Sequence, residues 1–251
     1  MPHSHSQTAT PSHLGRGAVI IPALDEESMV ADVITSIKEA VALPVWVIDD
    51  NSQDSTARVA ANTGAKVIRL RERLGAWGAA QTGLREALRL DLDFVVTMDS
   101  DGQHLASDIL PLVNTLAREN ADIVIGSCPE RGSALRRMAW GLMRLSSGLE
   151  HSDMTSGFRV LNRDAIKLLA SAEASQLDFQ DIGVLLILER AGCRIAEHPV
   201  TMTPRTNGKS RIFRSWSAVI FYMLQTLLLG AAKRRRITPR RINPSPDAGG
   251  K

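Results

Sequence analysis

The chain has 251 residues, of which 44% are hydrophobic and 23% are charged, so it can bury one substantial core. This composition excludes a wholly disordered protein. The formal net charge is only +3, but residues 205–251 hold eleven Lys and Arg and one acidic residue. A basic C-terminal segment on a mildly acidic body points to an anionic partner, either membrane lipid or nucleic acid.

The N-terminal residues 1–16 are rich in Ser, Thr, Pro and His and contain no apolar run of the kind found in signal peptides. We expect a disordered N-terminal tail and a cytosolic protein. Cys128 and Cys193 lie in apolar contexts without the spacing of a metal site, so we expect both to be reduced.

From residue 18 onward, short β-branched runs alternate with amphipathic segments of helical length. The runs AVIIP, VWVIDD, KVIRL, DFVVTMD and DIVIG are predicted strands, buried on both faces of a parallel sheet. The predicted helices between them cover residues 26–41, 52–64, 75–90 and 107–120. We expect Ser107 to cap the last of these, with Asp108 as its first residue. The alternation predicts a doubly wound α/β domain with a mostly parallel sheet and helices on both faces.

The later half of the chain is less regular. Helical runs occur around residues 133–147 and 180–191, and strands are predicted near residues 156–161 and 194–201. We interpret this part as an elaboration of the same sheet.

Acidic residues follow three of the first four predicted strands, in the sequences PALDEE, DDNSQDST and DSDGQH. Ligands bind at the carboxyl ends of the strands in such sheets, and carboxylates gathered there raise each other's pKa unless a cation is present. Asp99 and Asp101 can point the same way from an extended segment, and Gln103 continues the alternation. Oxygen ligands suit Mg²⁺ or Mn²⁺. A polar turn that merely ends the strand is the alternative, but the other acidic strand ends favour a metal site.

Two further features are expected at this edge. A pair such as Asp49 and Asp50 can accept hydrogen bonds from the base or ribose of a nucleotide, or it can form a local turn or helix cap. The glycines of the GAWG stretch, including Gly78, can let the backbone approach a ligand, although the pattern is a weak signal.

Taken together, the motifs VIIPALDEE, VIDDNSQDST, MDSDGQH, SGFRVLNR and RTNGKSR resemble the family 2 glycosyltransferases of the GT-A fold, and within them the dolichyl-phosphate mannose synthase branch. The resemblance covers about residues 18–212. It implies that a nucleotide-sugar is held by Pro22, Leu24, Glu26, Asp50 and Asp99. It also implies that the metal on the diphosphate is bound by Asp99, Asp101 and Gln103.

The resemblance further implies that Arg205 and Lys209 lie on a mobile loop over the phosphates, where they would stabilise developing charge. The alternative is a solvated basic loop. The mannose synthases usually carry an arginine where this chain has Cys128, and Arg131 is a possible replacement in the nucleotide-sugar site. The QxxRW motif of processive synthases is absent, which argues against polymer formation by that route.

The resemblance implies that the acceptor is a polyprenyl phosphate, which needs no general base because it is already anionic near neutral pH. Asp181 matches the approximate position at which family 2 enzymes with hydroxyl acceptors keep an acid. A sugar or protein hydroxyl is therefore the alternative acceptor, with Asp181 as its base. The resemblance favours a structural or positioning role for Asp181.

Residues 216–232 form an apolar segment that ends in the basic run of residues 233–236. The segment is about as short as a membrane-spanning helix can be, so we expect an amphipathic helix lying on the membrane surface. An ordinary core helix is the alternative. Deeper anchoring would need a small membrane partner protein.

The motifs and the resemblance together thus predict a metal-dependent glycosyltransferase that moves one sugar to a polyprenyl phosphate at the cytoplasmic face of a membrane. The resemblance also implies that the enzyme inverts the anomeric configuration. Nucleic acid is not expected as a partner, because aromatic residues are only 4% of the chain and stacking platforms are scarce. The expected organisation is a disordered tail, a GT-A domain, an interfacial helix and a basic disordered tail, at residues 1–16, 17–212, 213–236 and 237–251.

Overall fold

The computed structural model describes residues 15–131, 151–177 and 182–203. The strands are β1 Gly17–Ala23, β2 Val45–Asp49, β3 Lys66–Arg69, β4 Phe94–Thr97, β5 Ile123–Ser127, β6 Arg159–Asn162 and β7 Ile195–Pro199. The α-helices are α1 Val30–Ala40, α2 Thr56–Asn62, α3 Gly75–Arg89, α4 Ile109–Arg118, α6 Arg163–Leu169 and α7 Ile182–Arg190. Short 3₁₀ turns span Ala106–Asp108, Pro129–Arg131 and Ala174–Gln176.

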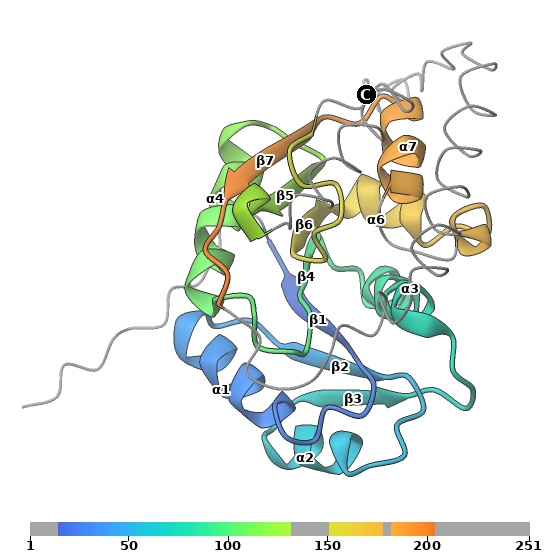
Figure 1. The fold of residues 1–251 in the computed structure, drawn as a ribbon. Coiled ribbons are helices and arrows are strands. Elements are labelled where there is room, and N and C mark those ends of the chain that lie inside the picture. Colours follow the sequence, from blue (N-terminus) through green and yellow to red (C-terminus); the bar gives the residue numbers. More distant parts are fainter. Residues whose placement is uncertain (1–14, 132–150, 178–181, 204–251) are drawn as a thin grey trace, which may run out of the picture.

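The described strands form one sheet in the order β3-β2-β1-β4-β6-β5-β7 (Figure 1). Strand β6 runs antiparallel to both of its neighbours, and the other pairs are parallel. The five strands predicted from the first half are all present. The strands expected in the later half are β6 and β7, and both join the same sheet, as expected. The helical run expected at residues 133–147 lies outside the described residues.

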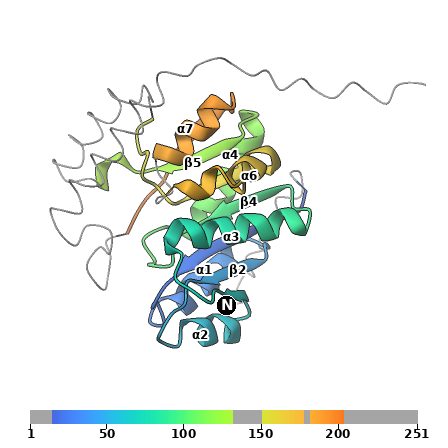
Figure 2. The same ribbon diagram turned by 90° about the vertical axis from the view of Figure 1, so that its right-hand side faces the viewer.

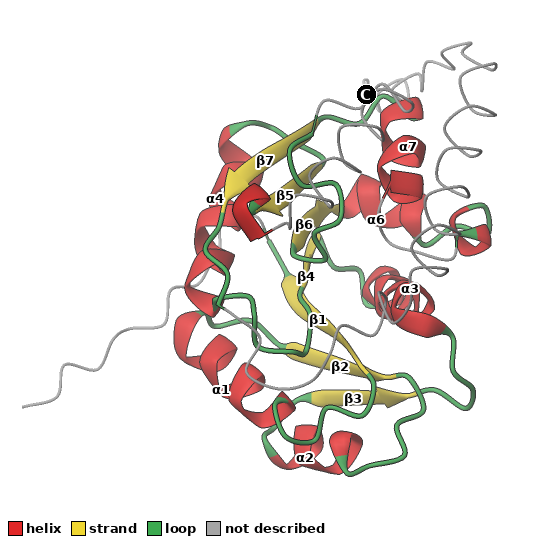
Figure 3. Ribbon diagram, viewed as in Figure 1, coloured by secondary structure: helices red, strands yellow, loops and turns green. Residues whose placement is uncertain are grey.

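Helices cover both faces of the sheet (Figures 2 and 3). The buried side chains on the two faces form two separate cores. One core packs β1 residues such as Ile20 against α3, α6 and α7. The other packs the alternate β1 residues, such as Val19 and Ile21, against α1 and α4. Because successive side chains of a strand point to opposite faces, the continuous apolar runs of the sequence supply both cores at once.

Helix α3 lies unusually close to β1. A Cβ atom added at Gly83 would come within 2.5 Å of the Ile20 Cγ2 atom. The absence of a side chain at Gly83 therefore allows the middle of α3 to approach β1 closely.

The start of α4 differs from the prediction. A 3₁₀ turn begins at Ala106, α4 proper begins at Ile109, and the side chain of Ser107 makes no capping hydrogen bond. Asp108 occupies the cap position, and its carboxylate instead accepts a hydrogen bond from the Thr201 amide at 3.2 Å. The sequence pattern could not show this contact, because Thr201 lies far along the chain.

Candidate functional site

The carboxyl ends of β1, β2 and β4 meet at one edge of the sheet, as the alternating pattern predicts. Ala23 of β1 is in register with Asp49 of β2, and Ile20 of β1 with Thr97 of β4. The loops that follow these strands contain the acidic motifs of the sequence. This edge is therefore the candidate functional site.

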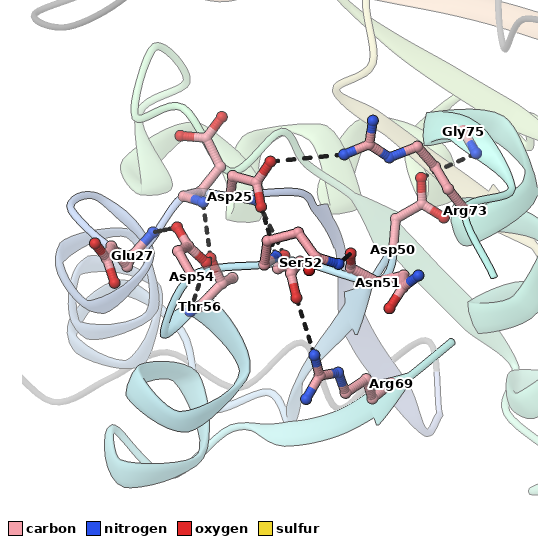
Figure 4. A network of polar contacts seen from close by, with 12 residues as sticks. Asp25, Glu27, Asp50, Asn51, Ser52, Asp54, Thr56, Arg69, Arg73 and Gly75 are labelled. Carbon is pink, nitrogen blue, oxygen red and sulfur yellow. Dashed lines mark hydrogen bonds and ion pairs between the residues drawn. The ribbon is translucent and has the colours of Figure 1, made fainter. Parts of the chain in front are cut away.

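The loops after β1 and β2 are joined by hydrogen bonds in both directions (Figure 4). The Asp25 amide donates to Ser52 Oγ at 2.9 Å, and the Gln53 amide donates to Asp25 Oδ1 at 2.8 Å. The Glu26 amide donates to Thr56 Oγ1 at 2.8 Å. These contacts fix the backbone of the two loops relative to each other.

Two residues in these loops adopt left-handed backbone conformations. Asp25 has φ 48° and Asn51 has φ 60°. Asp and Asn tolerate this region better than other residues with side chains. Such conformations persist only where surrounding contacts hold them, and they are common at functional sites. Here the hydrogen bonds between the two loops provide that support.

Asp54 is held ionised within the same network. Burial raises the pKa of its carboxyl, but hydrogen bonds from the Thr56 hydroxyl and amide and from the Glu27 amide outweigh that effect and hold the pKa below its usual value. Asp54 therefore acts as a charged acceptor that orders the start of α2.

Asp50 is almost fully buried and ties the end of β2 to the start of α3. Its Oδ1 accepts a hydrogen bond from the Leu74 amide at 2.6 Å, and its Oδ2 accepts one from the Gly75 amide at 2.9 Å. The neighbouring Arg73 is 3.6 Å from Asp25 Oδ2. The segment that leads into α3 is thus anchored to both acidic loops.

Arg69, the last residue of β3, lies at the same edge of the sheet, and the sequence analysis did not identify it. Its Nε lies 3.2 Å from Asp49 Oδ2, and its guanidinium donates to the Ser52 carbonyl at 2.9 Å. The Asp49 carboxylate is fully buried, and its oxygens have no hydrogen bond among the described residues, so this ion pair compensates its burial. The arginine at the end of the KVIRL run was the available signal, because β3 was predicted to lie beside the other strands.

The loop after β4 carries the predicted metal ligands. Asp101 Oδ1 accepts a hydrogen bond from the Gln103 amide at 3.1 Å, and Asp99 Oδ2 lies 3.1 Å from Nε2 of His104. Gly102, between Asp101 and Gln103, has φ +74°. A Cβ atom there would lie 2.8 Å from the Met29 methyl carbon. The motif is therefore a tight turn and not an extended continuation of the strand.

The donor set fits a divalent cation. The Asp99 side chain is 40% exposed, and Asp101 and Gln103 are half-buried. These three residues are therefore partly open to solvent at the edge of the sheet that forms the candidate site. Mg²⁺ and Mn²⁺ accept one or two carboxylates and take their remaining ligands from water and substrate phosphates. The described residues contain no cluster of three or more His, Cys, Asp and Glu that would form a closed protein cage.

The chain returns to this loop after β7. The Thr203 amide donates to the Gln103 carbonyl at 2.9 Å, and the Thr203 hydroxyl donates to the Gly102 carbonyl at 3.0 Å. Met202 forms an antiparallel bridge with His104. Thr203 immediately precedes the segment that contains the RTNGKSR motif.

The remaining predicted site residues fall into two groups. Pro22 lies in β1, Leu24 and Glu26 lie in the loop that follows it, Gly78 lies in the first turn of α3, and Arg131 ends a 3₁₀ turn after β5. Asp181, Arg205, Lys209 and the predicted interfacial helix lie outside the described residues. Within the described part of the chain, no helix is long and apolar enough to cross a bilayer.

Solved structures with the same arrangement of elements include glucosyl-3-phosphoglycerate synthase from Mycobacterium tuberculosis in complex with Mn²⁺, UDP and glucosyl-3-phosphoglycerate. It matches with a TM-score of 0.65 and 23% sequence identity, over 86% of this chain and 80% of that one. The likeness confirms the predicted GT-A fold.

Characterised relatives include the undecaprenyl-phosphate mannosyltransferase of Micrococcus luteus. It is 28% identical over 215 residues, which cover 78% of this chain and 87% of the relative. The UDP-N-acetylglucosamine–dolichyl-phosphate N-acetylglucosaminyltransferase of Methanococcus voltae is 26% identical over 209 residues, which cover 72% and 83%. These relatives confirm the resemblance to the dolichyl-phosphate mannose synthase branch.

The sequence model described as "Glycosyl transferase family 2" matches residues 18–169, which is more than half of the chain. The matched region contains the loops after β1, β2 and β4 that form the site edge. The protein therefore belongs to glycosyl transferase family 2 and is a glycosyltransferase.

Proposed function

We propose that this protein is a metal-dependent, inverting glycosyltransferase that moves one sugar from a nucleotide-diphosphate donor to a polyprenyl phosphate at the cytoplasmic face of a membrane. The observation that carries the proposal is the convergence of three acidic loops at one edge of the sheet. Relatives whose names specify undecaprenyl and dolichyl phosphate acceptors support the choice of acceptor.

The nucleotide would bind across the ends of β1 and β2. Pro22, Leu24 and Glu26 present the end of β1, and the hydrogen bonds between the two loops make this surface rigid before the donor arrives. Asp50 would contribute indirectly, since its carboxylate sets the position of the Leu74 and Gly75 amides at the start of α3. Asp50 would then mainly shape the donor site, and a direct contact between Asp50 and the nucleotide would be of secondary importance. Gly78 and Arg131 would complete the nucleotide-sugar site.

Asp99, Asp101 and Gln103 would hold Mg²⁺ or Mn²⁺ against the donor diphosphate. The bound cation would stabilise negative charge on the leaving nucleoside diphosphate. The tight turn at Gly102 brings the two carboxylates to the same edge as the nucleotide loops. The Mn²⁺ and UDP of the M. tuberculosis structure are consistent with this use of the fold.

The acceptor phosphate would reach the sugar from the face opposite the leaving group, which inverts the anomeric configuration. Arg205 and Lys209 would neutralise charge on the donor diphosphate and on the acceptor phosphate. Thr203, two residues before Arg205 in the sequence, is hydrogen bonded to the turn at Gly102 and Gln103, which supports a role for this segment at the phosphate site. Asp181 would have a structural or positioning role.

The segment at residues 216–236, which is apolar up to residue 232 and basic from residue 233, would lie on the membrane surface, where the lipid acceptor resides. Its Lys and Arg residues would contact lipid phosphates. This segment would also recognise a small membrane protein as an additional partner.

The test is a transfer assay with purified protein, Mn²⁺ or Mg²⁺, a short polyprenyl phosphate and a panel of labelled GDP- and UDP-sugars. Label is expected in the organic phase with one donor, and a chelator should abolish it. A product of the opposite anomeric configuration to the donor, measured by NMR, would establish inversion. If donor binds with metal but no lipid is labelled, the acceptor assignment is wrong.

A further inference from the structure

The motif DSDGQH ends in a histidine that the proposed chemistry does not use. The His104 side chain has no exposed surface, and its ring packs against Phe158 with the ring centroids 4.9 Å apart. Its Nε2 atom lies 3.1 Å from Asp99 Oδ2. A buried ring therefore contacts, through one defined atom, a carboxylate that is 40% exposed at the site edge.

The surroundings of the ring select one tautomer. The Nδ1 atom is buried and has no hydrogen-bond partner among the described residues. A neutral imidazole carries its proton on one nitrogen only, and an N–H buried without an acceptor is costly. The proton therefore belongs on Nε2, where it is donated to Asp99.

The backbone of His104 is also fixed. His104 is bridged to Met202, and the neighbouring Gln103 carbonyl accepts the Thr203 amide at 2.9 Å. The ring is thus held by Phe158 on one side and by a paired backbone at its base. Because the ring is anchored in this way, the hydrogen bond is kept only when Asp99 Oδ2 points towards Nε2, so the contact favours that orientation of the carboxylate.

We propose that His104 is a positioning residue that orients Asp99 for the divalent cation. The inference rests on the proposed function, in which Asp99 is a metal ligand. Carboxylates that bind metals are commonly held by such outer contacts, and removing one typically lowers metal affinity about 10- to 100-fold. His104 acts on the cation through Asp99 and need not touch substrate.

Two variants separate the hydrogen bond from the packing of the ring. His104→Phe keeps an aromatic ring against Phe158 but removes the donor. His104→Gln places an amide N–H at about the position of Nε2 and can restore the donor. His198→Gln is the control, because His198 Nδ1 contacts the Thr115 hydroxyl at 3.0 Å and neither residue belongs to the acidic loops.

The readout is Mn²⁺ affinity, measured by electron paramagnetic resonance on the full chain with a nucleoside diphosphate and no acceptor, so that no turnover occurs. Urea unfolding of each variant confirms that it is folded. We expect His104→Phe to weaken Mn²⁺ binding about 10- to 100-fold. His104→Gln should recover most of the affinity, and His198→Gln should bind Mn²⁺ like the wild type.

Equal Mn²⁺ affinity of the wild type and a folded His104→Phe variant would overturn the role of His104 alone. Equal losses in folded His104→Phe and His104→Gln would also overturn it, because packing and not the donor would then matter. Absence of Mn²⁺ binding by the wild type would instead overturn the proposed function and this role with it.

A measurement on the wild type keeps the inference testable if His104→Phe does not fold. Nitrogen-15 NMR of the histidine rings reports which nitrogen carries the proton. We expect the Nε2–H tautomer for His104. A ring protonated only on Nδ1 would contradict the proposal, because its Nε2 could not donate to Asp99.

Discussion

The carboxylate of Asp50 accepts a hydrogen bond from the backbone amide of Gly75 at 2.9 Å, and this contact joins the end of β2 to the first residue of α3. Its other oxygen accepts the Leu74 amide. A charged group that accepts two amides where a helix begins is favourably placed, because the first amides of a helix have no partners within the helix. One buried side chain thereby sets the position of the start of α3 relative to the end of β2.

Replacing Asp50 with alanine should destabilise the fold, because the Leu74 and Gly75 amides would lose the buried carboxylate that accepts both of their hydrogen bonds. We expect the free energy of unfolding to fall by about 2 kcal/mol in urea denaturation. Glu72→Ala is the control, since Glu72 is exposed in the same loop and its removal should change stability by no more than about 0.5 kcal/mol. An Asp50→Ala protein as stable as that control would show that the anchor is dispensable.

Asp101→Asn should weaken Mn²⁺ binding by at least about tenfold in calorimetric titration with a nucleoside diphosphate, because a carboxylate ligand becomes a neutral amide. Asp32→Asn provides the matched change at an exposed position on α1 and should leave the affinity unchanged. If Asp101→Asn binds Mn²⁺ and donor as tightly as the wild type, the assignment of Asp101 as a ligand is wrong.

Glu86 should make stability depend on pH in the acid range. Hydrogen bonds from Arg89 and Lys66 lower the pKa of its carboxyl from 4.5 to about 2. A lowered folded-state pKa means that the stabilisation is fully present above about pH 4.5 and is lost as the pH falls towards 2. Glu86→Gln should therefore be less stable than the wild type at pH 7, and the difference should shrink between pH 4.5 and 2.

Urea denaturation of both proteins at several pH values measures that difference. The contribution should also be larger at low salt, since Lys66 and Arg89 are partly exposed and their interactions are screened. A stability difference that stayed constant from neutral pH into the acid range would contradict the assignment.

Gly83→Ala should destabilise the protein, because the new methyl group would meet Ile20 Cγ2 at 2.5 Å. Overpacking costs about 1–3 kcal/mol, and the better helix propensity of alanine offsets up to about 1 kcal/mol of this. In an Ile20→Ala background the same change should lose its destabilising effect, because the clashing atom is gone. Purely additive effects in this double-mutant cycle would rule out the proposed contact.

The sequence was sufficient to predict the parallel strands and the shared edge of the acidic loops, because both follow from local periodicity and the order of strands in such sheets. It could not predict contacts between distant segments. The Asp50 contact with Gly75 and the pairing of Met202 with His104 depend on tertiary approach. The hydrogen bond from the Thr201 amide to the Asp108 carboxylate is a third contact of this kind.

His104 illustrates a different limit. Its position in the motif was evident, but the pattern alone did not distinguish a ligand from a buried support. Only its burial and the 3.1 Å contact with Asp99 point to a positioning role. The role of Arg69 likewise depends on the tertiary structure, because its ion pair with Asp49 requires β3 to lie beside β2.

The most direct test of the account compares two acceptors that differ by one group: a polyprenyl phosphate and the same polyprenol without phosphate. Each is incubated with the wild-type protein, Mn²⁺ and the donor sugar that binds. We predict that label enters the organic phase only with the phosphate, and that a chelator abolishes it. Transfer to the free polyprenol, or to a soluble hydroxyl acceptor in preference to the lipid phosphate, would contradict the account.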